Sequence, residues 1–385
     1  MLEIAGDLLD TLAAGRRVAV ATLTRVLGSA PRTLGTAMAV TETGTVIGSI
    51  SGGCVEGAIY ESAQEVLETG RGQLTEFGVS DDDAFAVGLS CGGTVEVFLA
   101  EFAPAGQRNA LPDAVRAQLE RAAAGQAAGL ALVVAGTGAG LMLGPDAAGS
   151  EDFAGDGDFA GLDESAAPET SLGLGADDVR RIRAKLRAVV ASGQSTVGTL
   201  DCDGVTSRVL YLVAQAPPRC LIFGAVDFAS ALSAAASLLG YRVTICDARA
   251  VFATPERFPT AAEVVVEWPS DYLARTPTDA RTVVCVLTHD EKFDLPLLIT
   301  ALSLDVGYVG AMGSRRTHER RMQRLQEAGV AAADLARLHS PIGLDLGASS
   351  PEETAVSILA EVLADRSGAS GVPLRDRQGP IHPSD

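Results

Sequence analysis

The chain has 385 residues, and its 49 acidic against 30 basic residues give a formal net charge of −19 at pH 7. This charge argues against nucleic acid or an anionic membrane surface as the main partner. No apolar run reaches the roughly 18 residues that a membrane-spanning helix needs, so we expect no membrane segment. The length predicts two or three domains, because one domain commonly holds about 100–200 residues.

The N-terminal residues predict an amphipathic helix through Ile4, Leu8 and Leu12 that ends at Gly15. They lack the basic start and the apolar centre of a secretion signal, so we expect a cytoplasmic protein in a reducing compartment. After this helix, apolar β-rich runs predict strands over residues 18–26, 36–41 and 45–50.

The third predicted strand leads into Ser51-Gly52-Gly53-Cys54, just before a predicted helix over residues 55–70. The free amides and the positive dipole end at a helix start lower the pKa of a cysteine and attract anions. Cys54 is therefore a candidate soft ligand for a metal that is held by a phosphorylated organic molecule. The structural alternative is a small buried cysteine in a tight turn.

A second glycine-flanked cysteine, Cys91 in Cys91-Gly92-Gly93, precedes a predicted strand that begins near Val95. Zinc is a poor explanation for Cys54 and Cys91, because neither belongs to a C-x-x-C pair and every histidine lies at or beyond His289. A disulfide is not favoured in a reducing compartment.

Residues 149–178 carry nine acidic side chains and no Lys or Arg, set among glycines and alanines. We interpret this segment as a flexible loop or linker, because it has too little apolar surface to offset the entropy lost on ordering. A helix is predicted at about 176–191, and residues 195–200 and 207–213 predict a hairpin. Pro217 and Pro218 then mark the end of a first domain, residues 1–216.

In the second half, predicted strands alternate with helices, and the strands fall at residues 220–224, 242–246, 263–267, 282–287 and 307–310. This alternation predicts a Rossmann-like, doubly wound parallel sheet over residues 217–366, with a ligand crevice at the carboxyl ends of its strands. A capping box at residues 350–353 opens the last helix. Residues 367–385 are predicted to form a flexible tail.

The first turn of this second domain departs from the dinucleotide-binding pattern, because Val226 stands where the second glycine belongs. Val226 should keep the backbone away from a pyrophosphate, and Asp227 adds a repelling charge. Asp247 lies about where a ribose-binding acid is found. The alternative function is therefore an NAD(P)-dependent oxidoreductase, with His289 as the proton donor.

A second anion site is predicted where a strand ends and a helix begins near Ser314, Arg315 and Arg316. Free helical amides, a hydroxyl and two arginines favour phosphate as the ligand. The structural alternative is a capped helix with a solvated basic face. His289 also follows a strand, and it is either a ligand contact or a hydrogen-bonded structural histidine.

Taken together, these motifs resemble the XdhC/CoxI family over nearly the whole chain outside the acidic segment. The resemblance rests on residues 28–32, 48–58, 91–93, 288–290, 310–316, 341–348 and 350–353. It implies an N-terminal mixed α/β domain of the XdhC type and a C-terminal Rossmann-like domain. The chain departs from the family at Val226 and Asp227, where relatives carry Gly-His.

The resemblance implies a chaperone rather than an enzyme, one that binds and protects molybdenum cofactor of the molybdopterin type. The acceptor would be an apo-molybdoenzyme of the xanthine dehydrogenase or carbon monoxide dehydrogenase type. Cys54 and Cys91 would face the cofactor, with Arg32 and the amides of Gly52 and Gly53 near its anionic parts. The Cys54 thiolate would contact molybdenum or hold a persulfide. Further expected partners are a cysteine desulfurase, a cytidylyltransferase and a second copy of the chain in a homodimer.

Overall fold

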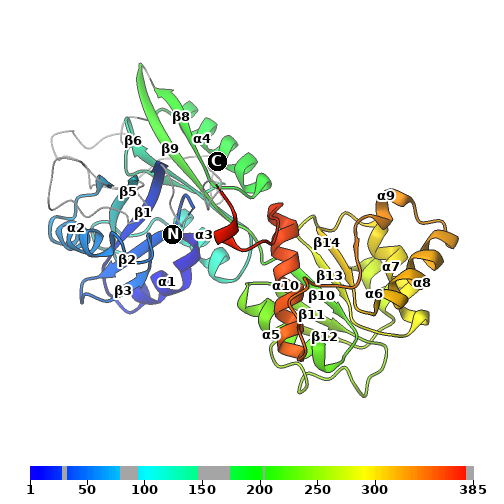
Figure 1. Ribbon diagram of the computed structural model, residues 1–385. Coiled ribbons are helices and arrows are strands. Elements are labelled where there is room, and N and C mark those ends of the chain that lie inside the picture. The colour runs from blue at the N-terminus through cyan, green and yellow to red at the C-terminus, as the bar shows by residue number, and fades with distance from the viewer. Residues whose placement is uncertain (28–32, 79–93, 146–173, 203, 379–385) are drawn as a thin grey trace. The chain divides into compact units, whose positions relative to one another are not determined.

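The computed structural model describes residues 1–27, 33–78, 94–145, 174–202 and 204–378. The chain forms two compact units, Met1–Ala216 and Pro217–Arg377 (Figure 1). We call them unit 1 and unit 2 and describe each by itself. The division falls at Pro217-Pro218.

Unit 1 contains two antiparallel sheets. The first has the strand order β3-β2-β1-β5-β4 and consists of β1 (Val18–Leu27), β2 (Ala37–Thr41), β3 (Val46–Gly48), β4 (Gln73–Phe77) and β5 (Thr94–Phe102). The second has the order β7-β6-β9-β8 and consists of β6 (Ala128–Ala135), β7 (Met142–Leu143), β8 (Thr196–Cys202) and β9 (Val205–Ala214). The central strands β1, β5 and β6 are almost continuously buried, because both faces of each sheet are covered.

Helices cover the outer faces of these sheets, and the inner faces share one core. The helical elements are η1 (Leu2–Ile4), α1 (Ala5–Ala13), α2 (Glu56–Thr69), α3 (Asp113–Ala123) and α4 (Ala176–Ser192). Helix α2 packs Ile59, Ala63 and Val66 on the first sheet, because residues at this spacing lie on one helical face. Helix α4 covers the second sheet in the same way, while α1 and α3 join the core between the sheets.

Unit 2 contains a six-stranded parallel sheet in the order β12-β11-β10-β13-β14-β15. Its strands are β10 (Arg219–Phe223), β11 (Arg242–Cys246), β12 (Glu263–Val265), β13 (Val283–Val286), β14 (Tyr308–Ala311) and β15 (Leu338–His339). The order reverses between β10 and β13, which makes that gap the switch point of a doubly wound fold. The predicted α/β class with a Rossmann-like parallel sheet is confirmed.

Helices cover both faces of this sheet (Figure 1). They are α5 (Asp227–Leu238), α6 (Pro269–Arg275), α7 (Glu291–Ser303), α8 (Arg315–Glu327), α9 (Ala332–Leu335) and α10 (Pro351–Ser367), followed by the 3-10 helix η3 (Leu374–Asp376). Helices α5 and α10 pack on one face, and α6 to α9 pack on the other. The predicted capping box is present, because Ser350 and Glu353 cap α10 reciprocally.

A polar cluster ties α10 to the edge of this sheet. One carboxylate oxygen of Glu361 accepts hydrogen bonds from the Tyr308 hydroxyl at 2.5 Å and from the Gly343 amide at 2.7 Å. His339 stacks on the Tyr308 ring, with Nδ1 3.3 Å from Glu361 and Nε2 3.6 Å from Asp365. The hydrogen bond to Glu361 outweighs burial and raises the pKa of His339.

This cluster makes the stability of unit 2 depend on pH. The raised pKa of His339 means that its stabilising contribution is fully present below its ordinary pKa of 6.5 and is lost as pH rises through the folded-state value. We expect the free energy of unfolding to fall over that range in the wild type and to lose this decrease in His339→Gln. Urea unfolding followed by the fluorescence of Trp268, the single tryptophan, measures it. Equal pH slopes in the two proteins would contradict the assignment.

Candidate functional site

Cys54 lies in the turn between β3 and α2. Gly52 and Gly53 have positive φ angles of 79° and 123°, and a Cβ on either would meet open space. The turn therefore requires glycine for its backbone conformation rather than for lack of room. The Cys54 side chain is half-buried and packs against the apolar cluster beneath α2.

The carboxylate of Glu56 holds this turn in place. One oxygen accepts hydrogen bonds from the Ser49 hydroxyl at 2.7 Å, the Ser51 amide at 2.8 Å and the Gly52 amide at 2.9 Å. The other accepts from the Gly53 amide at 2.8 Å and from the Ser51 hydroxyl. Burial opposes ionisation, but the hydrogen bonds from Ser51 and Ser49 lower the pKa of Glu56 to about 2.

The amides predicted to attract an anion beside Cys54 thus already have an anionic acceptor within the chain. Glu56 is the first residue of α2, so its negative charge also neutralises the positive end of that helix. The sequence analysis missed Glu56; the available signal was an acidic residue in the first turn of a helix, close to two serines. A role for Gly52 and Gly53 in ligand binding stays a prediction.

Arg32 and Cys91 lie outside the described residues. Their flanking strands meet at one end of the first sheet, where Leu27, the last residue of β1, pairs with Thr94, the first residue of β5. Cys54 packs against the same apolar cluster as Val26 and Val95, on the α2 side of that sheet. Cys54 therefore lies on the same face of the first sheet as the side chains of Val26 and Val95, near the paired ends of β1 and β5.

Charged residues that the sequence analysis missed lie on the opposite face at this sheet end. Glu96 of β5 is buried, and it accepts hydrogen bonds from the Thr24 hydroxyl at 2.5 Å and from Arg208 of β9 at 2.8 Å. Arg25 lies 3.8 Å from the same carboxylate. Because Arg208 belongs to the second sheet, this cluster fastens the two sheets to one another.

In unit 2, the Rossmann turn is also held by a carboxylate. One oxygen of Asp247 accepts from the Ala225 amide at 2.8 Å and from Arg249, and the other accepts from the amide and Nε of Arg249. Burial opposes ionisation, yet these hydrogen bonds lower the pKa of Asp247. Both oxygens are thus engaged within the turn, and Asp227 lies 3.4 Å from Arg257. This geometry gives the NAD(P) alternative no support.

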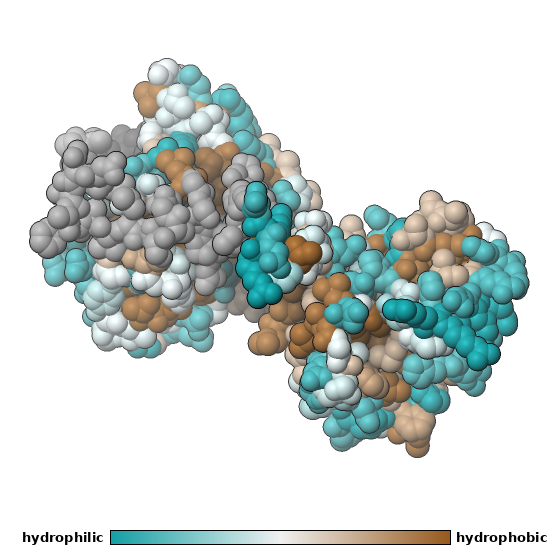
Figure 2. Space-filling model, in the orientation of Figure 1, coloured by the Kyte–Doolittle hydropathy of each residue, from teal (hydrophilic) through white to brown (hydrophobic). Residues whose placement is uncertain are grey.

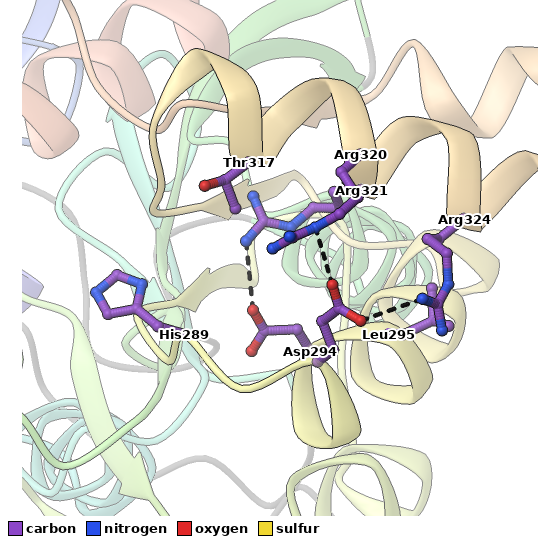
Figure 3. A pocket seen from close by; sticks show the side chains of 8 residues that line it. His289, Asp294, Leu295, Thr317, Arg320, Arg321 and Arg324 are labelled. Atoms are coloured by element: carbon purple, nitrogen blue, oxygen red, sulfur yellow. Dashed lines mark hydrogen bonds and ion pairs between the residues drawn. The ribbon is translucent and has the colours of Figure 1, made fainter.

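His289 and the start of α8 follow the neighbouring parallel strands β13 and β14, and both line a pocket at that edge of the sheet (Figure 3). Ser314 is the N-cap of α8, since its side chain accepts a hydrogen bond from the Thr317 amide at 3.2 Å. Arg315 is exposed. Binding of a ligand by Ser314, Arg315 and His289 stays a prediction.

Among the described residues, no group of three or more His, Cys, Asp or Glu side chains is arranged to hold a metal ion. No helix in the same part of the chain is both long enough and apolar enough to cross a membrane.

The fold and the site define a class of two-unit α/β protein, in which one unit carries a cysteine on a glycine turn and the other is a Rossmann-type unit. Two family models match the chain, that of the XdhC and CoxI family over residues 11–78 and that of the XdhC Rossmann domain over residues 220–362. The chain belongs to the XdhC and CoxI family.

Several relatives cover one or both units. The molybdenum cofactor insertion chaperone PaoD of Escherichia coli is 26% identical over 93% of this chain and 86% of its own length. A protein of Bacillus subtilis described as a probable xanthine dehydrogenase subunit is 25% identical over 93% of this chain and 96% of its own length. The uncharacterized protein YqeB of Escherichia coli is 32% identical, but the match spans only 50% of this chain and 35% of that protein.

A solved structure supports the fold. A crystal structure described as a xanthine dehydrogenase from Bacillus halodurans matches 97% of this chain and 98% of its own chain, with a TM-score of 0.63 and 24% identity.

The role of Glu56 generates a prediction about stability. Glu56→Ala removes the acceptor for the buried Ser51 and for two glycine amides, so we expect unit 1 to lose about 1–2 kcal/mol of unfolding free energy. Urea unfolding followed by circular dichroism measures the loss. The matched control is Glu61→Ala, an exposed acid on the same helix, which should change little. Equal losses in both variants would show that Glu56 does not hold the turn.

Proposed function

We propose that this protein binds molybdenum cofactor of the molybdopterin type and takes part in the maturation of a molybdoenzyme. The observation that carries the proposal is the match to a molybdenum cofactor insertion chaperone along 93% of the chain, which spans both units. Membership of the XdhC and CoxI family agrees with it. The match to a probable xanthine dehydrogenase subunit favours an acceptor of the xanthine dehydrogenase type.

We assign the primary thiol contact to Cys54. The Ser51 hydroxyl accepts hydrogen bonds from the amides of Cys54 at 2.9 Å and Val55 at 3.0 Å, and Glu56 fixes Ser51 in turn. The sulfur thus sits on a backbone whose position is set by several hydrogen bonds. A thiolate is the soft ligand that suits a metal already bound to its own organic ligand.

The partners that we propose are those implied by the family resemblance. Cys54 would hold the molybdenum centre, or it would carry a persulfide received from a cysteine desulfurase, and Cys91 and Arg32 would complete the contacts. A cytidylyltransferase and an apo-enzyme of the xanthine dehydrogenase or carbon monoxide dehydrogenase type would exchange cofactor with this protein. We propose that this protein acts as a homodimer in these steps.

Cofactor uptake tests the proposal. Under anaerobic conditions the purified protein should take up molybdenum cofactor from a loaded donor and raise the activity of an apo-molybdoenzyme when the two are mixed. Molybdenum analysis and mass spectrometry of the re-isolated protein measure the uptake. Retention of neither molybdenum nor the pterin would overturn the proposal. Molybdenum retained without transfer would restrict the role to storage and overturn delivery.

The assignment of the primary thiol makes a separate prediction. Cys54→Ser should weaken cofactor binding at least tenfold, which is about 1.4 kcal/mol, because the fixed turn presents that sulfur. Cys91→Ser is the matched control and should have the smaller effect. Binding is measured on proteins with matched melting curves. A larger loss in Cys91→Ser would transfer the primary role to Cys91.

A further inference from the structure

A small pocket, partly open to solvent, lies between α7 and α8 in unit 2 (Figure 3). It is found at the carboxyl end of β13 and β14, where ligands bind in doubly wound sheets. Its charged and polar lining residues are His289, Glu291, Asp294, Thr317 and the three arginines 320, 321 and 324.

The floor of the pocket is a buried and fully bonded ion pair. Arg321 Nη2 lies 3.3 Å from Asp294 Oδ2, and it also donates to the Met312 carbonyl at 3.0 Å. Arg321 Nη1 donates to the Ser340 hydroxyl at 2.9 Å, and the Thr288 hydroxyl donates to Asp294. Arg321 and Asp294 are both buried, so this pair holds α8 against the sheet and leaves no charge of its own for a ligand.

The mouth of the pocket carries an excess of positive charge. Arg320 Nε lies 2.9 Å from one oxygen of Glu291, and Arg324 Nη1 lies 3.2 Å from the other oxygen. All three side chains are exposed. One carboxylate is therefore shared by two guanidinium groups, each of which contacts a different oxygen.

This excess stands out in a chain with a net charge of −19. Helix α8 contains five arginines and only two glutamates. The surface over this helix is hydrophilic, as Figure 2 shows, so no apolar patch competes for the same area. A local excess of positive charge favours the approach of a small anion to this surface.

We propose that this pocket binds a phosphate group, held by Arg320 and Arg324, and that Glu291 is the internal counterion which the phosphate displaces. The two guanidinium groups already contact the two oxygens of one carboxylate, and the oxygens of a phosphate monoester offer the same pairing with one more negative charge. Thr317 adds a hydroxyl at the pocket wall, and His289 lines its opening. The site differs from the predicted one at Ser314 and Arg315, because the Ser314 side chain caps the helix.

This site lies wholly within unit 2, and its existence does not depend on the proposed cofactor function. The ligand is free phosphate or the phosphate of a larger molecule. Titration calorimetry with inorganic phosphate, with ribose 5-phosphate and with unphosphorylated ribose distinguishes the two. Tighter binding of ribose 5-phosphate than of phosphate supports a sugar phosphate as the ligand, whereas equal binding supports phosphate alone. Measurable binding of ribose at the same concentrations would overturn the requirement for phosphate.

Three variants test the residues. The double variant Arg320→Gln, Arg324→Gln should lose at least tenfold in affinity for inorganic phosphate, and Glu291→Gln should gain about tenfold because the competing carboxylate is neutralised. The double variant Arg242→Gln, Arg375→Gln is the matched control, since it also removes two charges from exposed positions of unit 2, and neither residue lines the pocket. It should change affinity by less than twofold. The exposed positions of these side chains should leave folding intact, which the fluorescence of Trp268 checks.

Two results would overturn the proposal. If the control variant Arg242→Gln, Arg375→Gln weakened binding as much as Arg320→Gln, Arg324→Gln, the attraction would be a general property of the charge on unit 2. If Glu291→Gln bound no phosphate at millimolar concentration, the arginines would not form a phosphate site. In that case an acidic protein segment that protects Arg320 and Arg324 from chemical modification would assign the same surface to a protein partner.

Discussion

The position of Cys54 depends on one set of hydrogen bonds, those that converge on the carboxylate of Glu56. Because these bonds lower the pKa of Glu56 to about 2, the carboxylate is ionised throughout the physiological range and the turn does not loosen with pH. The same bonds use the amides that would otherwise make the start of α2 an anion site. A ligand at this turn would therefore meet a fixed sulfur atom and backbone amides that are already hydrogen-bonded, so the sulfur is the atom of the turn that remains to bind it.

In unit 2, carboxylates of the chain act as internal acceptors at two further places. Asp247 fills the Rossmann turn, and Glu291 fills the space between Arg320 and Arg324. In each case a carboxylate of the chain occupies a position that its surroundings would give to an external anion. An internal carboxylate has a high effective concentration, so an external anion must bring further contacts or a higher charge to replace it. Asp247, which is buried and bonded through both oxygens, is the hardest of these to displace; Glu291, which is exposed, is the easiest.

The sequence predicted the strands of unit 2 more completely than those of unit 1. The difference lies in how clearly each strand appears as a local pattern of apolar residues. Five parallel strands appear as separate apolar runs, whereas β15 has only two residues and gives no such run. In unit 1, β4 alternates half-buried and exposed residues before its buried last residue, and β6 pairs with β9, which lies far along the chain. The contact between Glu96 and Arg208 joins residues 112 positions apart, so no local pattern could reveal it.

In the candidate site, Cys54 was predicted because a cysteine in a glycine turn is a local signal. Glu56 was missed because an acidic residue in the first turn of a helix is common.

The counterion Glu291 also affects how easily an anion leaves the pocket. Arg320 and Arg324 are exposed, so water solvates their guanidinium groups when an anion departs, and the carboxylate of Glu291 can return between them. Both effects favour release, and the affinity for an external anion is correspondingly lower. A tenfold reduction in affinity corresponds to about 1.4 kcal/mol, a small part of what several ionic hydrogen bonds can supply. Glu56, in contrast, stays bonded to the amides of its own turn, so it fixes the backbone at Cys54 and does not compete with a ligand for the sulfur.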